Sequence, residues 1–192
     1  ALHFDAMQPP LFNGVRGLSQ KAPDAHHASH HYRLPHLAAS GQLPRAGRTV
    51  EVSGSAWLDH EWSSAYMPSG ARGWDWTGIN LADGGALMLF RMRDADGKPL
   101  WAGGTLRRAD GSGVEFVVWR VPEPVPPAEH PFKYRLVYLE NGQRVVGFDN
   151  ERGKGDHKHV GDVEAAYVFV TVDRLLDDFF AEVEQWKTRN TR

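Results

Sequence analysis

Residues 57–76 hold the densest group of side chains capable of chemistry in this chain. Residues 57–62 read Trp-Leu-Asp-His-Glu-Trp, and residues 73–76 read Gly-Trp-Asp-Trp. A buried tryptophan needs a partner for its indole N–H, and Asp and Glu are rarely fully buried unless they are paired. Interleaving both kinds is typical of a mostly apolar small-molecule pocket that contains a few fixed polar groups.

Three consecutive residues, Asp59, His60 and Glu61, form the predicted catalytic group. In a strand, Asp59 and Glu61 would share one face with Trp57, and His60 would share the other face with Trp62. Burial among tryptophans would raise the pKa of one carboxyl group and make it a proton donor near neutral pH. His60 would be the natural general base at pH 7.

Two mechanisms use these groups. In ester or lactone hydrolysis, His60 would activate a water molecule, Asp59 or Glu61 would orient the imidazole, and an indole N–H would stabilise the oxyanion. In alkene hydration, a carboxyl group would protonate the double bond, and aromatic faces would stabilise the carbocation. The predicted substrate-binding residues are Trp57, Trp62, Tyr66, Trp74 and Trp76.

The same residues also fit a structural role. Asp59 and Glu61 could cap loops or pair with Arg72 or Arg91, and two tryptophans on one strand face could be plain core. Asp75, on the opposite face from Trp74 and Trp76, is expected to face solvent or to form a salt bridge. The catalytic and structural interpretations both remain open at this point.

A second group of candidate functional residues lies in the last third of the chain. Basic groups near aromatic rings suit phosphate and base contacts on RNA, and a histidine beside a cation can cleave RNA by acid–base catalysis without a metal. Acidic residues interspersed among them offset the charge, so a mobile surface loop is the alternative. The candidate RNA-site residues are Lys133, Arg135, Arg152, Lys154, His157 and His159.

Composition excludes several classes of protein. The chain has 192 residues with a formal charge of −2, so it has no global basic field that would attract nucleic acid. Cysteine is absent, which excludes disulfides, thiolate zinc sites and a cysteine nucleophile. No apolar run is long enough for a transmembrane helix. The first residues do not read as a signal peptide, so either a leader was removed or the numbering begins inside a longer gene.

Histidine clustering raises the question of a metal. Four of the ten histidines lie within residues 26–31. No His-Glu-x-x-His motif and no cysteine pair supports a metal site, so a solvated loop is the favoured interpretation. No metal and no cofactor is predicted.

Strand signals begin after the first quarter of the chain. Residues 1–48 are rich in turn-forming residues and are expected to be loop-rich. Alternating strands are predicted at 49–54, 74–81, 86–93 and 114–121, and Asp-Gly turns separate several of them. This spacing indicates an antiparallel meander, a sandwich or a barrel.

The remaining third is predicted to be a small α+β unit. A stiff proline-rich connector at 122–131 precedes a hairpin that turns at Asn141-Gly142. A glycine-rich loop at 150–161 and a short strand at 167–170 follow. Apolar residues at helical spacing predict a helix at about 171–187, and Thr171 or Asp173 would be its N-cap.

Residues 1–110 carry an ordered set of motifs, at residues 17–21, 28–32, 54–62, 73–76 and 81–88. In these motifs the chain resembles the lipocalin-like secreted hydrolases that are relatives of AttH and carotenoid 1,2-hydratase. The Asp-His-Glu-Trp core is the most diagnostic part. Members of that family are longer and carry two barrel-like β domains, so this chain resembles their central piece.

Residues 113–187 resemble a different family, the TumE toxins of toxin–antitoxin systems. The similarity rests on residues 118–122, 132–136 and 148–159, which include the run Asp-Asn-Glu-Arg-Gly-Lys-Gly-Asp-His. The two resemblances meet near residues 108–112. The chain is therefore interpreted as a gene fusion, a recombined metagenomic reading frame or an engineered join.

Together these observations predict a mainly β (α+β) protein. A lipocalin-like antiparallel meander or partial barrel would occupy residues 1–110, and a TumE-like β-hairpin with a C-terminal helix would occupy 111–192. The first predicted function is a hydrolase-type enzyme acting on a hydrophobic ester or lactone. The alternatives are a TumE-like toxin that acts on RNA and is neutralised by an antitoxin, an alkene hydratase, or an inactive fusion. The first resemblance implies a secreted or periplasmic protein, and the second a cytoplasmic one.

Overall fold

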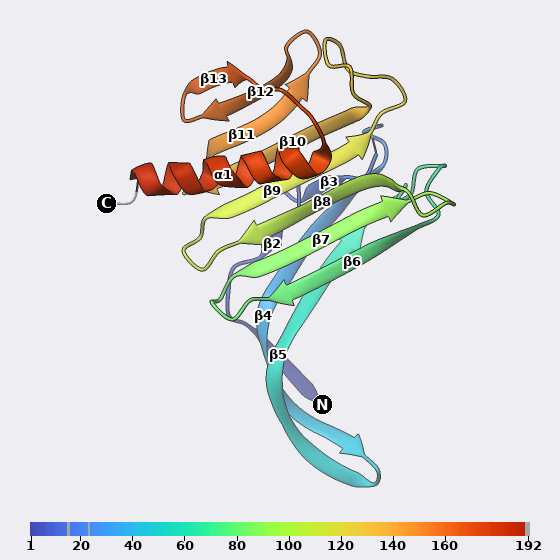
Figure 1. Ribbon diagram of the computed structural model, residues 1–192. Coiled ribbons are helices and arrows are strands. Elements are labelled where there is room, and N and C mark those ends of the chain that lie inside the picture. Colours follow the sequence, from blue (N-terminus) through green and yellow to red (C-terminus); the bar gives the residue numbers. More distant parts are fainter. Residues whose placement is uncertain (15, 23, 191–192) are drawn as a thin grey trace.

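Two antiparallel sheets and one C-terminal helix make up the fold (Figure 1), in a computed structural model that describes residues 1–14, 16–22 and 24–190. The first sheet, sheet A, contains β1–β5, and β4 pairs with each of the other four strands. Its strands are β1 (Leu2–Ala6), β2 (Leu11–Phe12), β3 (Leu18–Gln20), β4 (Ala28–Arg45) and β5 (Arg48–Trp62).

The second sheet, sheet B, is an eight-stranded meander in which each strand pairs with the next one along the chain, from β6 to β13. Most of its turns contain a glycine with positive φ, as the Asp-Gly and Asn-Gly signals predict. Its strands are β6 (Gly73–Asn80), β7 (Ala86–Arg93), β8 (Pro99–Arg107), β9 (Gly113–Arg120), β10 (Phe132–Glu140), β11 (Gln143–Glu151), β12 (Gly155–Val160) and β13 (Val163–Ala166).

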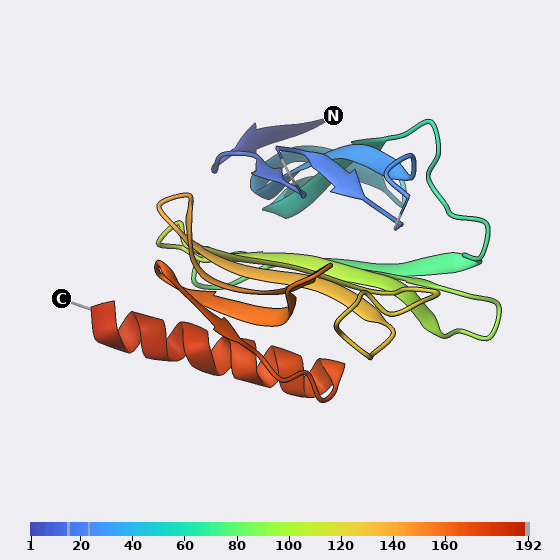
Figure 2. The same cartoon turned by 90° about the horizontal axis from the view of Figure 1, so that it is seen from above.

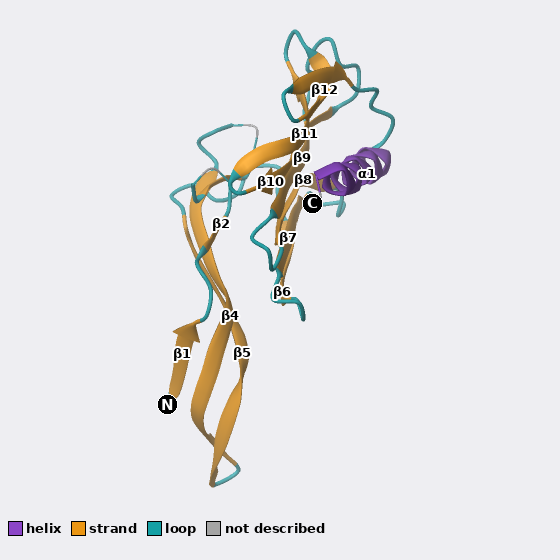
Figure 3. Cartoon of the chain, turned by 90° about the vertical axis from the view of Figure 1, so that its left-hand side faces the viewer, coloured by secondary structure: helices purple, strands orange, loops and turns teal. Residues whose placement is uncertain are grey.

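Sheet B is the middle of three layers. Sheet A lies against one of its faces, and the helix α1 (Val172–Asn190) lies against the other, as Figure 2 shows from above. The long β4–β5 ribbon extends past the edge of sheet B, so that its far half stands clear of sheet B and is paired there with β1 (Figure 3). The predicted mainly β class with one C-terminal helix is confirmed.

The helix packs on the apolar side of β9–β11. Leu175, Phe179 and Val183 are fully buried, and they meet inward-facing residues of the sheet such as Leu136 and Phe148. The helix begins where predicted, because the Thr171 hydroxyl accepts a 3.1 Å hydrogen bond from the backbone N–H three residues later. Local periodicity therefore predicted both the helix and the face that it buries.

Three secondary-structure predictions were wrong. Residues 1–48 are not mainly loop, since β4 alone runs for 18 residues and pairs with neighbouring strands over its length. Residues 155–160, expected to be loop, form β12, and the last strand is 163–166, because 167–170 form none. In β4 and β12, cross-strand pairing overrides the local turn signals, whereas residues 167–170 form no strand because the pairing of β13 with β12 ends at Ala166.

The predicted boundary between residues 110 and 111 does not interrupt the sheet. β8 pairs with β9 across it, with Trp101 opposite Trp119 and Thr105 opposite Glu115. Over the described ranges the two sheets remain open and do not close into a barrel. The division into 1–110 and 111–192 therefore remains a prediction about two units that share one continuous sheet.

Among the described residues, no helix is both long and apolar enough to cross a membrane.

Candidate functional site

A group of charged side chains is enclosed between the two sheets. The pairing of β4 with β5 places His31 opposite Glu61 and Arg33 opposite Asp59, so all four point to one side of sheet A. His31 and Arg33 are buried positions of β4 that alternate with more exposed ones. This alternation places their side chains on the side of sheet A that faces sheet B. Lys21, immediately after β3, is buried beside them. These five residues are called the charged cluster below.

Ion pairs and a hydrogen bond link the charged cluster. The Nζ of Lys21 lies 2.9 Å from Oε1 of Glu61, and a serine hydroxyl from β4 donates to the same oxygen over 2.5 Å. His31 lies between the carboxylates, with Nδ1 3.4 Å from Oε1 of Glu61 and Nε2 3.4 Å from Oδ2 of Asp59. The Nε of Arg33 is 3.4 Å from Oδ1 of Asp59.

Burial divides the cluster into a hidden part and an accessible part. The side chains of Arg33 and His31 are 0% and 3% exposed, whereas those of Asp59 and Glu61 are 25% and 19% exposed. Neither ring nitrogen of His31 and none of the guanidinium nitrogens of Arg33 makes a hydrogen bond within the described chain. Unpaired buried donors are costly, so these side chains are held mainly by the charge of the carboxylates.

The electrostatics of the cluster keep Glu61 ionised. Burial alone would raise the pKa of Glu61, but the charge of Lys21 and hydrogen bonds from Ser29, Tyr66 and Lys21 lower it below its ordinary value. The expectation that burial makes a carboxyl group here a proton donor near neutral pH is therefore wrong for Glu61. Burial lowers the pKa of Lys21 despite its carboxylate partner, and it lowers the pKa of Arg33 to about 10.

His60 lies on the other face of β5, as strand alternation requires. Its ring stacks on Tyr32 at 5.3 Å and meets Trp62 edge-on at 5.0 Å. The expectation that Asp59 or Glu61 orients the His60 imidazole is therefore wrong, because those two side chains point to the opposite side of β5. The imidazole that lies beside both carboxylates is that of His31, opposite Glu61 on β4.

The predicted aromatic residues separate in the same way. Trp62 stacks on His30 of β4, on the outer face of sheet A, which is the face directed away from sheet B and from the charged cluster. On the inner face, the indole N–H of Trp57 donates to Oδ1 of Asp59 over 2.8 Å, and Trp57 meets Trp76 edge-on at 6.3 Å between ring centroids. Tyr66 contacts Trp74 at 6.2 Å on the same measure.

Four predicted aromatic residues therefore gather where β5 passes near the edge strand β6. Trp74 and Trp76 are 53% and 44% exposed, so this edge is open to solvent on the side of the accessible carboxylates. Asp75 points out of the opposite side of β6, where it pairs with Arg91 at 2.7 Å. The expectation of a salt bridge at Asp75 is confirmed.

A cavity of about 570 Å³ lies between β3 and the middle of sheet B. Its wall reaches the charged cluster through Ser19, whose hydroxyl accepts a 2.9 Å hydrogen bond from Lys21. Trp101 and Trp119 stack at 4.4 Å on the opposite wall, and their buried indole N–H groups make no hydrogen bond within the described chain. None of the aromatic residues predicted to bind substrate lines this cavity.

The predicted RNA-site residues come largely to one face. Lys133 and Arg135 on β10 line the cavity, and strand alternation places His157 and His159 of β12 on the same side of sheet B. The remaining two lie outside this group, in the turn between β11 and β12. These two residues are Arg152 and Lys154.

Individual contacts show how the charge of these predicted RNA-site residues is balanced. The Nζ of Lys133 donates to a backbone carbonyl of β11, and Lys154 pairs with Glu164 at 3.1 Å. Burial lowers the pKa of Lys133, and burial together with the charge of Arg144 lowers the pKa of His159. Several of these basic groups are therefore already engaged within the chain, which limits the positive field that they present.

Sequence reasoning missed the basic half of the charged cluster. Lys21, His31 and Arg33 lie in a part of the chain expected to be loop-rich, where no strand face was assigned. The available signal was a weak alternation in the sequence. Polar Ser29, His31 and Arg33 alternate with the ring-bearing His30 and Tyr32 and are followed by an apolar leucine. Interpreted as a strand, this alternation indicates a polar inner face.

Comparison with known families follows the same division of the chain. The AttH-like family model matches residues 1–119, which is more than half of the sequence. The chain belongs to the AttH-like family. The Toxin TumE family model matches residues 103–187, so the two matches overlap on β8 and β9. No curated protein matches the sequence.

A solved structure supports the AttH-like assignment. The chain is similar to a Nitrosomonas europaea protein whose crystal structure is described as that of a candidate AttH, with 28% identity and a TM-score of 0.56. The match covers 84% of this chain and 61% of that one, so the present chain spans less than two thirds of its neighbour. The structural match covers 84% of the chain, whereas the AttH-like family model matches only residues 1–119. The structural similarity therefore extends beyond residue 119 into the part that the TumE model matches.

Proposed function

We propose that this AttH-like chain is a hydrolase-type enzyme that cleaves an ester or lactone of a hydrophobic small molecule. The observation that carries the proposal is the charged cluster, in which two partly exposed carboxylates are backed by buried basic groups and flanked by tryptophans. Charged groups that are desolvated and held in fixed positions are common where charge develops during a reaction.

The substrate would approach at the β5–β6 edge, because Asp59 is the most exposed member of the cluster. Its carboxylate would accept a proton from a water molecule, whose oxygen attacks the carbonyl carbon and forms a tetrahedral oxyanion. Collapse of the oxyanion breaks the C–O bond, and the leaving alkoxide takes the proton from Asp59. The indole rings of Trp57 and Trp76 would contact the apolar part of the substrate.

The basic residues would contribute most of the catalysis. A carboxylate is a weak general base, so the larger effect would have to come from the positive charge of Lys21 and Arg33, which lie buried behind the carboxylates and would stabilise the oxyanion electrostatically without touching it. Glu61 would hold Lys21 in place rather than transfer a proton, because its pKa is lowered. The lowered pKa also makes Glu61 unsuited to alkene hydration, which needs a carboxylic acid that donates a proton.

The test is hydrolysis of p-nitrophenyl esters with acyl chains of increasing length, and of lactones. We expect Asp59→Asn to lower kcat/KM by about 10²–10⁴-fold, the usual contribution of a general base. Asp75→Asn is the matched control, because it neutralises a carboxylate on the outward side of β6 and should leave the rate unchanged. Equal activity of Asp59→Asn and the unsubstituted protein would overturn the proposal.

Two histidine variants decide which face of β5 is used. His31→Ala should lower the rate, because it removes the imidazole between the carboxylates, whereas the contacts of His60 lie on the outer face. If His60→Ala abolishes hydrolysis and His31→Ala does not, the reaction uses the outer face and the charged cluster is structural. Circular dichroism of both variants establishes that any loss of rate is not a loss of fold.

A second candidate function is a TumE-like toxin activity on RNA, held in check by an antitoxin. The observation in its favour is the placement of Lys133, Arg135, His157 and His159 on one side of β10–β12. Expression of the chain should then arrest growth, and His157→Ala should relieve the arrest. Lys98→Ala, in an exposed turn of the AttH-like part, is the control and should not relieve it. Unimpaired growth on expression would count against this function.

A further inference from the structure

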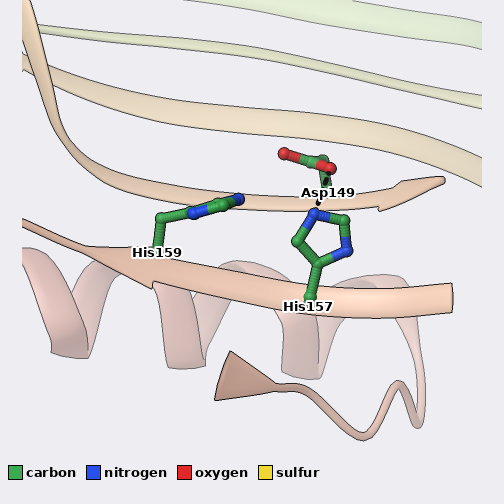
Figure 4. A group of neighbouring side chains, drawn as sticks. All are labelled: Asp149, His157 and His159. Carbon is green, nitrogen blue, oxygen red and sulfur yellow. Dashed lines mark ion pairs between the residues drawn. The ribbon is translucent and has the colours of Figure 1, made fainter. Parts of the chain in front are cut away.

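Three potential metal ligands converge on the face of sheet B that looks away from the helix. Asp149 on β11 lies opposite His157 on β12, and His159 follows two residues later on the same side. One ligand atom from each residue lies within 4.8 Å of the other two. Figure 4 shows the three side chains beside one another, Asp149 on β11 and the two histidines on the neighbouring β12. Within the described residues, no other group of three such side chains has this geometry.

A hydrogen bond fixes the orientation of the His157 ring, and a longer contact with a carboxylate lies beside the His159 ring. The Nδ1 of His157 lies 2.9 Å from the backbone carbonyl of Gly155, which can only accept, so this nitrogen carries the proton. The Nδ1 of His159 faces the carboxylate of Glu164 at 3.9 Å. In each ring Nε2 is left as the nitrogen available to a metal. A metal-bound histidine almost always has such a partner on its other nitrogen.

The contact between His157 and Asp149 is incomplete without a further ligand. The Nε2 of His157 lies 3.0 Å from Oδ1 of Asp149, yet this oxygen is buried and makes no hydrogen bond within the described chain. The His157 side chain is only 5% exposed. The buried carboxylate oxygen thus faces a ring nitrogen without hydrogen-bond geometry, which is costly for the carboxylate.

We infer that Asp149, His157 and His159 form a binding site for a divalent transition-metal ion of the zinc class. Two imidazole nitrogens and one carboxylate oxygen suit zinc, and three protein ligands leave a position for water or another ligand, as in catalytic zinc sites. Asp149 also lines the cavity between the sheets, so that open position has a space beside it. The site does not depend on the proposed hydrolase function.

Surrounding charges set the affinity. Arg144 and Lys133 interact electrostatically with members of this group and would oppose a cation, whereas Glu151 and Glu164 would favour one. The ion would be bound less tightly than in a site whose surroundings are purely acidic. Zinc or cobalt should therefore bind saturably in a 1:1 ratio, with an affinity that rises when Arg144 is replaced by Gln.

The experiment uses the full chain without an affinity tag. Co²⁺ alone, and then Zn²⁺ alone, is titrated by calorimetry and, for Co²⁺, also by visible absorption. We expect one equivalent to bind and Co²⁺ to produce the intense absorption of a four- or five-coordinate ion. His159→Ala and Asp149→Asn should each weaken binding by at least about 10–100-fold, since the loss of even an outer partner typically has that effect.

The clustered histidines of the turn before β4 provide the matched control. His26 and His27 lie side by side at 5.9 Å between ring centroids, so they test for adventitious binding by imidazoles outside the site. Binding retained in His26→Ala/His27→Ala and lost in His159→Ala supports the inference. Binding that survives both His159→Ala and Asp149→Asn, or the absence of saturable binding, overturns it. Circular dichroism distinguishes ligand loss from unfolding.

Discussion

The two faces of sheet B are built from opposite chemistry. Toward α1 the contacts are apolar, with Leu175, Phe179 and Val183 against the side chains of β9–β11. Toward sheet A the same strands present lysine, arginine and carboxylates, next to a cavity and the charged cluster. The apolar interface therefore supplies most of the stability, whereas the polar interface keeps charged groups in place at some cost in stability.

The largest expected effect tests the apolar interface. Phe179→Ala should lower the free energy of unfolding by about 3–5 kcal/mol, because the ring is fully buried and its removal leaves a cavity. The neighbouring Phe180 is 39% exposed, so Phe180→Ala is the matched control with a much smaller loss. Urea denaturation measures both. Equal losses would show that the helix does not anchor the fold through this face.

A smaller effect tests the polar interface. Lys21→Met should lower the free energy of unfolding by about 1–3 kcal/mol, because Glu61 and Ser19 lose a buried partner. The double variant Lys21→Met/Glu61→Gln should lose less than the sum of the single variants, since neither charge is then left unpaired. A strictly additive double variant would show that this ion pair contributes no coupling.

Acid unfolding sharpens the same comparison. The pKa of Glu61 is lowered in the folded chain, so its contribution to stability is present above the ordinary pKa of glutamate, about 4.3. That contribution is lost as the pH falls through the lower folded value. Glu61→Gln should therefore flatten the loss of stability below about pH 4.3. Glu123→Gln, at an exposed position, provides the control, and an unchanged slope in Glu61→Gln would contradict the prediction.

The smallest effect is expected outside both interfaces. Asp75 and Arg91 form an ion pair at 2.7 Å, but both side chains are about half exposed. Exposed ion pairs contribute little because water and salt screen them. Asp75→Asn should therefore leave the denaturation midpoint within experimental error. A clear shift would show that the outer face of β6 is covered in solution.

The accuracy of prediction from sequence differed between the ends of the chain. The helix, its cap at Thr171 and the hairpin at Asn141-Gly142 were predicted because each depends on residues close together in the sequence. The 18-residue strand β4 was missed, because its glycine and prolines favour turns locally while its neighbours supply the pairing. The alternating faces of residues 59–61 were predicted, but the partners of these side chains were not.

The sequence by itself determined the antiparallel β character of the chain, the helix and the faces to which consecutive side chains point. These properties follow from backbone geometry with a period of two in strands and 3.6 in helices. Only the tertiary structure decided that Lys21 and Arg33 meet the carboxylates, and that Asp149 meets two histidines of β12. Such contacts depend on strand register and on how two sheets stack, and neither is encoded within a short segment.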